Sequence, residues 1–267
     1  ITMANSYELP YDPSDLNWSS AGKNLYTRNG GSNQQYLQEK LASLEGGEDC
    51  VVLASGVAAL SGLFFALLKS GDHVVFSSVT YIAVYRLLNE LLKDKFGVET
   101  TIVDTTDIEK VKAAIRPNTK LIHIETPGNP TLSISDIEKI AELAHANSAL
   151  LSVDNTFASP FNQRPIELGA DFTVESLTKY INGHGDAMGG AIIGKKEYLD
   201  IIRAQSQINL GATISPFNAW LIMRGSVTLP LRMKQHNENA LKVARYLKTV
   251  KGVSFVAYPG LEDHPNH

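Results

Sequence analysis

From about residue 33 onward, short apolar runs alternate with longer stretches in which apolar residues recur every three or four positions. The short runs have the composition of buried strands, and the longer stretches have the period of amphipathic helices. This alternation predicts an α/β fold, with a mostly parallel seven-stranded sheet flanked by helices on both faces. The expected strands cover 50–55, 73–78, 98–103, 119–125, 149–154, 171–176 and 191–194.

The expected helices lie between these strands. A glycine ends each of the first two helical stretches, as is common at helix C-termini. The similar segments DIEKV (107–111) and DIEKI (136–140) place acidic residues in the first turn of a helix, where the helix dipole favours them, so we do not interpret them as a repeat. The predicted helices cover 34–47, 56–71, 80–94, 107–115, 135–147 and 195–206, and a long helical segment follows at 226–251.

The last residues show a different pattern. We expect the apolar run VSFVAY at 253–258 to form a short strand, although too few strands follow it to make a sheet. This run predicts the start of a second domain, and the abrupt beginning ITMANSYELPYDP likewise suggests part of a longer chain. We therefore divide the chain into an N-terminal arm at 1–32, a main domain at 33–225, and a linking helix with the start of a further domain at 226–267.

Composition excludes several classes of function. The net charge of −4 over 267 residues gives no strong field for nucleic acid or an anionic membrane surface. A single cysteine, Cys50, excludes an intrachain disulfide and suits the reducing cytoplasm, and the seven scattered histidines form no metal-binding motif. No apolar run approaches the roughly 20 residues of a membrane span. The sequence predicts a cytoplasmic protein without a metal, nucleic acid or membrane.

The residues that follow the predicted strands carry chemical groups. In sheets of this kind, ligands bind at the carboxyl ends of the strands. Ser55 and Gly56 stand at a strand-to-helix junction, where unpaired backbone N–H groups bind anions. The other strand ends add a ring, an amide, a carboxylate, two hydroxyls and an amine, from Tyr81, Asn129, Asp154, Ser176, Thr178 and Lys179. This set matches the needs of pyridoxal 5′-phosphate (PLP).

Each of these residues also has an ordinary structural explanation, as a surface lysine, a cap or a core side chain. Two rival motifs are incomplete. Ser176–Lys179 fits the S-x-x-K of penicillin-binding enzymes, but the companion S-D-N and K-T-G motifs are absent from the sequence. The run GHGDAMGG (183–190) has Met188 in place of the third glycine of a dinucleotide-binding loop.

The order of the motifs resembles the Cys/Met-metabolism, or trans-sulfuration, family of PLP-dependent enzymes. The resemblance covers nearly the whole chain and implies the fold of PLP-dependent transferases, which is fold type I, similar to aspartate aminotransferase. The motifs that carry it are YTR at 26–28, SGVAA at 55–59, ETPGNP at 125–130, DNTFASP at 154–160, SLTKYINGHGD at 176–186 and MRGSVTLPLRM at 223–233.

The resemblance implies a role for each residue. Lys179 would hold the cofactor as an imine and move the Cα proton of the substrate, and Asp154 would pair with the pyridine nitrogen. Tyr81 would stack on the ring and donate a proton, and Asn129 would reach the phenolic oxygen. The expected catalytic residues are Lys179, Tyr81 and Asp154.

The resemblance also implies how the cofactor is held. The phosphate would be bound by Gly56, Val57, Ser176 and Thr178, with Tyr26 and Arg28 supplied by a neighbouring protomer of a homotetramer, a dimer of dimers with shared active sites. An arginine for the substrate carboxylate is expected beyond residue 267. The cofactor-binding residues implied are Tyr26, Arg28, Ser55, Gly56, Val57, Tyr81, Asn129, Asp154, Thr156, Ser176, Thr178 and Lys179.

The implied reaction is a γ-elimination on cystathionine, methionine or a related homoserine derivative, by a carbon–sulfur lyase of sulfur amino-acid metabolism. The first alternative is a γ-replacement synthase, of the cystathionine γ-synthase or O-acetylhomoserine sulfhydrylase type. The second is a truncated, non-catalytic PLP-binding assembly protein. After Tyr81 the chain has Ile82-Ala83-Val84, where methionine γ-lyases have Gly-Cys-Thr, and this difference argues against methionine γ-lyase specificity.

Overall fold

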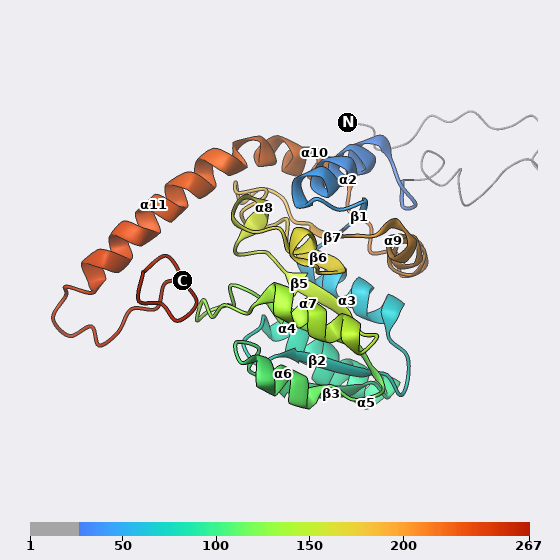
Figure 1. The fold of residues 1–267 in the computed structure, drawn as a ribbon. Helices are drawn as coiled ribbons and strands as arrows, with labels where there is room; N and C mark the ends of the chain where they lie inside the picture. The colour runs from blue at the N-terminus through green and yellow to red at the C-terminus, as the bar shows by residue number, and fades with distance from the viewer. Residues whose placement is uncertain (1–26) are drawn as a thin grey trace, which may run out of the picture. The chain divides into compact units, whose positions relative to one another are not determined.

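The structure is a computed structural model that describes residues 27–267. The chain divides into two compact units, of which one comprises Ile1–Leu68 and Phe172–Val227 and the other Lys69–Asp171 and Thr228–His267. Seven strands follow the order β1-β7-β6-β5-β4-β2-β3, so the predicted α/β fold with a mostly parallel seven-stranded sheet is confirmed (Figure 1). The division at residues 32 and 225 stays a prediction.

The first unit holds the antiparallel part of the sheet. Strand β7 (Gly190–Gly194) pairs antiparallel with β1 (Asp49–Leu53) and with β6 (Phe172–Glu175). All five residues of β7 are buried, as expected for an apolar run with no polar face. The helical elements of this unit are α2 (Ser32–Glu45), α3 (Gly56–Leu67), α9 (Lys196–Ile202), the π-helix η4 (Arg203–Asn209) and α10 (Pro216–Gly225).

Helix α10 lies in a segment for which the sequence predicted no element. The side chain of Ser215 accepts a hydrogen bond from the N–H of Asn218 at 3.1 Å, and Pro216 occupies the first helical turn. A serine cap followed by proline is a standard helix start. The Ser215-Pro216 pair is therefore the signal that could have revealed this helix.

The second unit holds the parallel strands. Strand β2 (His73–Ser77) pairs with β3 (Glu99–Val103) and β4 (Thr119–Glu125), and β4 pairs with β5 (Leu150–Asp154). One hydrophobic core cluster of this unit is formed by side chains from β2, β4 and β5 and from two helices, α6 (Ile108–Ala114) and α7 (Ile137–Ala146). Because the strands are parallel, the carboxyl ends of β4 and β5 lie side by side.

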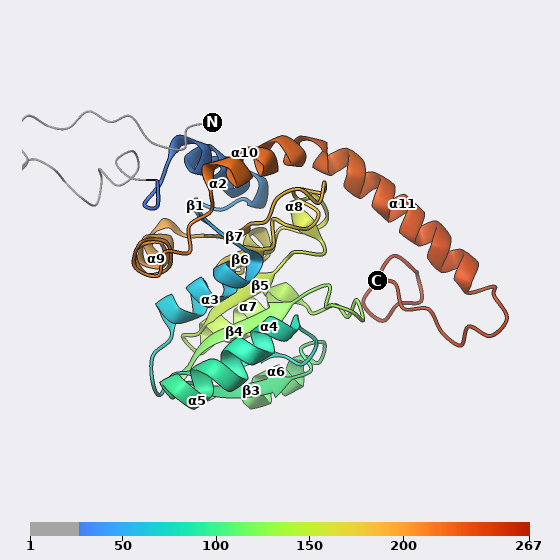
Figure 2. The same ribbon diagram turned by 180° about the vertical axis from the view of Figure 1, so that it is seen from behind.

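Further helical elements belong to the second unit. The stretch predicted at 80–94 is a continuous run of α4 (Ile82–Tyr85), the π-helix η2 (Arg86–Leu92) and α5 (Lys93–Phe96), as Figure 2 shows from behind. The long predicted helical segment appears as α11 (Leu229–Leu247), preceded by the short 3₁₀ helix η5 (Ser226–Thr228). Two short elements were not predicted, α8 (Ser159–Asn162) and the 3₁₀ helix η3 (Pro165–Leu168).

Two sequence predictions were wrong in detail. Residues 253–258 form no strand; Phe255 is 81% exposed, and a strand needs a partner for its backbone groups, which this segment does not find within the described residues. The helix predicted to end at Gly71 ends at Leu67, because Leu68 already has an extended backbone. Gly71 instead takes up the turn before β2, with a φ of 86°.

Two further observations concern the chain as a whole. Within residues 27–267, none of the helices combines the length and the apolar character that crossing a membrane requires. The single cysteine, Cys50, lies fully buried on β1. Burial, reinforced by the charge of Asp49, raises the pKa of its thiol well above the ordinary value.

Candidate active site

The start of α3 lies directly against the turn that follows β6. A Cβ atom placed on Gly56 would stand 2.8 Å from the Cβ of Ser176 and 2.9 Å from its Oγ. A Cβ on Gly190 would stand only 2.1 Å from the carbonyl oxygen of Ser55. The structure therefore brings together Ser55, Gly56 and Ser176, and glycine is required for the close approach.

The N-terminus of α3 presents backbone donors at this place. Ser55 caps the helix, since its Oγ accepts a hydrogen bond from the N–H of Ala58 at 3.0 Å, and its carbonyl accepts from Ala59. Within the described residues, the N–H groups of Gly56 and Val57 have no acceptor. Together with the Ser176 hydroxyl nearby, these two donors fit a phosphate group.

Lys179 lies in the turn after β6, three residues beyond Ser176. Its N–H donates to the carbonyl of Ser176 at 3.1 Å, and its carbonyl accepts from Gly183 at 2.8 Å. The hydroxyl of Thr178 both donates to the carbonyl of Gly189 and accepts from its N–H, each at 3.2 Å. These bonds fix the backbone of the turn, while Lys179 itself is exposed.

Two carboxylates stand at the ends of neighbouring strands in the second unit. Glu125 on β4 and Asp154 on β5 are register partners, and they are 6% and 7% exposed. Asp154 accepts a hydrogen bond from the N–H of Thr156 at 3.1 Å, and Thr156 is half-buried. Burial nevertheless raises the pKa of Asp154, against the lowering effect of the Thr156 hydrogen bonds.

Glu125 connects the two loops that carry the predicted ring contacts. Its Oε2 accepts from the N–H of Tyr81 at 2.6 Å and from the hydroxyl of Thr80 at 3.2 Å, and its Oε1 accepts from the N–H of Asn129 at 3.0 Å. Burial and then the charge of Asp154 raise the pKa of Glu125 to about 7. The structure thus brings Tyr81, Asn129 and Asp154 together around one buried acid.

The electrostatics of this carboxylate pair fit a cation. Among the described residues, neither Glu125 nor Asp154 forms an ion pair with a lysine, arginine or histidine. Two buried acids without a counter-charge are costly, and a protonated pyridine nitrogen beside Asp154 would relieve that cost. The donor set of the second unit therefore suits the ring of PLP, as that of the first unit suits its phosphate and aldehyde.

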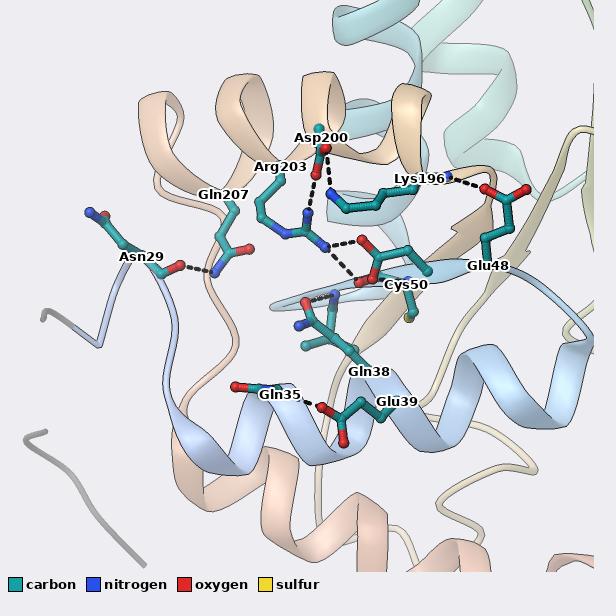
Figure 3. A network of polar contacts seen from close by, with 12 residues as sticks. Asn29, Gln35, Gln38, Glu39, Glu48, Cys50, Lys196, Asp200, Arg203 and Gln207 are labelled. Atoms are coloured by element: carbon teal, nitrogen blue, oxygen red, sulfur yellow. Dashed lines mark hydrogen bonds and ion pairs between the residues drawn. The ribbon is translucent and has the colours of Figure 1, made fainter. Parts of the chain in front are cut away.

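The segment that carries Arg28 is tied to other residues of the first unit. The Arg28 guanidinium donates to the carbonyl of Ile208 at 2.6 Å, and the hydroxyl of Thr213 donates to the Arg28 carbonyl at 2.6 Å. Figure 3 shows Gln207 donating to the carbonyl of Asn29, at 3.0 Å. Tyr26, the other residue expected to serve a neighbouring protomer, lies outside the described residues, and the shared site stays a prediction.

Glu125 is the residue that sequence reasoning missed. It belongs to the ETPGNP motif, but a glutamate at a strand end has many ordinary structural explanations, so the sequence alone predicts no role for it. The available signal was its position as the only acid in TKLIHIE (119–125), a run otherwise typical of a buried strand. A charge that ends such a run is expected to meet a specific partner.

Comparison with known proteins agrees with this chemistry. A family model described as Cys/Met metabolism PLP-dependent enzyme matches residues 1–267. Two curated relatives named canavanine gamma-lyase, from Rhizobium leguminosarum bv. trifolii and Pseudomonas canavaninivorans, are 57% and 55% identical over the whole chain, which spans 67% of each. An L-methionine gamma-lyase from Treponema denticola is 42% identical over 91% of the chain, which spans 61% of that relative.

Solved structures give the same answer. The crystal structure of metB from Corynebacterium glutamicum has a TM-score of 0.91 and 41% identity, covering 100% of this chain and 67% of its own. The cystathionine gamma-lyase from Lactobacillus plantarum, complexed with L-serine, has a TM-score of 0.91 and 38% identity, covering 99% of this chain and 67% of its own. The family and the fold predicted from the motifs are thus confirmed, and with them PLP as the cofactor. The chain belongs to the Cys/Met metabolism family of PLP-dependent enzymes.

Proposed function

We propose that the protein is a γ-lyase that removes the γ-substituent from an amino acid of the homoserine type. The observation that carries the proposal is the buried, unpaired carboxylate of Asp154 at a strand end, in a chain 57% identical to a canavanine gamma-lyase over its full length. Canavanine, methionine and cystathionine share one skeleton, with a heteroatom on the γ-carbon. We propose canavanine, whose γ-carbon bears oxygen, as the first substrate to test.

We propose a separate catalytic role for each site residue. When bound, PLP stabilises the negative charge left on a substrate carbon after proton loss. We propose that Asp154 keeps the pyridine nitrogen protonated, and that the Lys179 amine holds the cofactor and then moves the Cα proton. Tyr81 would protonate the leaving group, and Asn129 and Thr156 would orient the ring.

The phosphate side is proposed on the same basis. We propose that Ser55, Gly56, Val57, Ser176 and Thr178 bind the phosphate. The first four lie at or beside the N-terminus of α3, which supports an anion site, whereas Thr178 would exchange its hydrogen bond to the Gly189 carbonyl for one to the phosphate. We further propose that Tyr26 and Arg28 complete the site of a neighbouring protomer in a cytoplasmic homotetramer. The proposed domain limits remain 1–32, 33–225 and 226–267.

The test compares the wild type with Lys179→Ala. The wild type should show the visible absorption band of lysine-bound PLP and release hydroxyguanidine from canavanine, while 2-oxobutanoate and ammonia account for the remaining carbon and nitrogen. Lys179→Ala should lose both the band and the product. A wild type without the band would contradict the proposed cofactor site.

Product analysis separates the alternatives. A synthase would form a thioether when a thiol is added, in preference to releasing a keto acid. A non-catalytic PLP-binding protein would show the band but no product from canavanine, methionine or cystathionine. Continued release of the keto acid in the presence of an added thiol, without a thioether, would support the lyase.

A further inference from the structure

The loops that follow β2 and β4 meet at one buried carboxylate. The β2 loop reaches Glu125 through the Thr80 hydroxyl and the Tyr81 N–H, and the β4 loop reaches it through the Asn129 N–H. We propose that Glu125 is a positioning residue, which holds the Tyr81 ring and the Asn129 amide at the orientation that the cofactor ring requires. This inference rests on the proposed function for the identity of the ring.

The contacts explain why this position needs a carboxylate. Both Glu125 oxygens face donors, since Oε2 accepts from Tyr81 at 2.6 Å and Oε1 from Asn129 at 3.0 Å. A glutamine would turn an NH₂ group toward one of these N–H groups, so one contact would become a repulsion. An aspartate is one methylene shorter and could not span both loops.

The loops have few other means of holding this geometry. A Cβ on Gly128 would stand 2.9 Å from Cγ1 of Val79, so the two loops are in van der Waals contact there. The N–H of Gly128 is bonded to the Ser133 carbonyl at 2.9 Å, within its own loop. Among the described residues, Glu125 is the side chain that bonds to both Tyr81 and Asn129, whereas the Thr105 hydroxyl joins the two loops elsewhere, at Ser77 and Ser135.

The surroundings of Glu125 tie this anchor to the cofactor site. The titratable group that faces it is Asp154 on β5, and its other polar neighbours are the Thr80 hydroxyl and the two backbone N–H groups. Burial, and then the repulsion from Asp154, raises the pKa of Glu125. A cation bound beside Asp154 would favour ionised Glu125, which is the form that accepts from both loops.

The first experiment uses the cofactor-free protein. At pH 8, where Glu125 is ionised, we expect the amides of Tyr81 and Asn129 to exchange with solvent at least tenfold faster in Glu125→Gln than in the wild type. The matched control is Asp171→Asn, because Asp171 is also a buried acid of this unit that accepts from a backbone N–H, that of Leu151 at 2.8 Å. The control should leave the Tyr81 and Asn129 amides unchanged, and unchanged amides in Glu125→Gln would overturn the anchor.

The second experiment adds PLP. Glu125→Gln should bind PLP at least tenfold more weakly, and at saturation the induced circular dichroism of the bound cofactor should differ from that of the wild type, while Asp171→Asn keeps both values. Thr80→Val, a milder change, should shift them in the same direction. Wild-type affinity and dichroism in Glu125→Gln would overturn the positioning role.

The two experiments distinguish the inference from the proposed function. If the wild type fails to bind PLP, the proposed function fails, and the exchange rates alone decide whether Glu125 anchors the two loops. If the wild type binds PLP and Glu125→Gln behaves like the wild type in both experiments, only the positioning role fails.

Discussion

Gly56 shows how closely single residues pack at the proposed phosphate site. In Gly56→Ala, the new Cβ would lie 2.8 Å from the Ser176 Cβ, so we expect a loss of about 1–3 kcal/mol in the free energy of unfolding and weaker PLP binding. Urea unfolding and PLP titration measure the two effects. Adding Ser176→Gly should restore part of the stability, and no recovery in the double variant would contradict the steric explanation.

At the same scale, we expect the titration of Glu125 to make the free energy of unfolding depend on pH. Its pKa is raised from 4.5 to about 7, so folding favours the protonated form. The raised pKa therefore adds to the free energy of unfolding at low pH. This stabilisation, about 3 kcal/mol, is fully present below pH 4.5 and is lost as the pH rises through 7. Glu125→Gln lacks the titration, so the wild type should lose stability relative to this variant between pH 4.5 and 7.5. A pH-independent difference in urea unfolding of the cofactor-free protein would refute this.

Individual residues also show where sequence reasoning reaches its limit. Lys179, Asp154 and Asn129 could be proposed as site residues because each lies at or just after the end of a predicted strand, at the edge where ligands bind. Glu125 could not be assigned a role, because its importance lies in contacts with Tyr81 and Asn129, which belong to different loops. A motif gives the order of residues but does not show which side chain holds its neighbours in place.

At the scale of helices, two serine caps form a natural comparison. Ser55 at α3 and Ser215 at α10 accept from the N–H three residues on, at 3.0 and 3.1 Å. Replacing either by alanine should lower the free energy of unfolding by about 1 kcal/mol. Only Ser55→Ala should also weaken PLP binding in a titration, and an equal loss of affinity in Ser215→Ala would contradict the assignment of α3 to the phosphate.

The end of α10 supports the loop that follows Lys179. A Cβ on Gly225 would lie 2.4 Å from the carbonyl oxygen of Asn182 and 2.6 Å from its Oδ1. Gly225→Ala should therefore cost about 1–3 kcal/mol of stability and reduce the visible band of lysine-bound PLP. Ser226→Ala, which removes a hydrogen bond to the Met223 carbonyl, is the neighbouring control that should keep the band.

Periodicity found most elements and missed those that depend on context. The buried strands and amphipathic helices follow from local patterns. The segment at 253–258 has the composition of a strand but stays irregular, because a strand forms only where another strand accepts its hydrogen bonds. Periodicity did not predict helix α10, because this helix has no clear amphipathic period. Its sequence signal is the Ser215-Pro216 pair at its start.

For the molecule as a whole, the sequence predicted the fold class and the family, since seven apolar runs and six motifs in a fixed order are long-range information. It did not predict the division into two compact units, in which the first unit collects segments from distant parts of the chain. Strand β6 and β1 belong to the same unit although more than a hundred residues separate them. Such a division depends on which contacts form, and local patterns do not encode it.

The single cysteine can report how often the fold opens locally around β1. Cys50 is the only thiol in the sequence, it is fully buried on β1, and its raised pKa keeps it in the unreactive thiol form. A disulfide reagent such as Ellman's should therefore react slowly with the folded protein and at once in strong denaturant. The labelling rate then measures how often β1 becomes accessible to solvent, without any added dye or mutation.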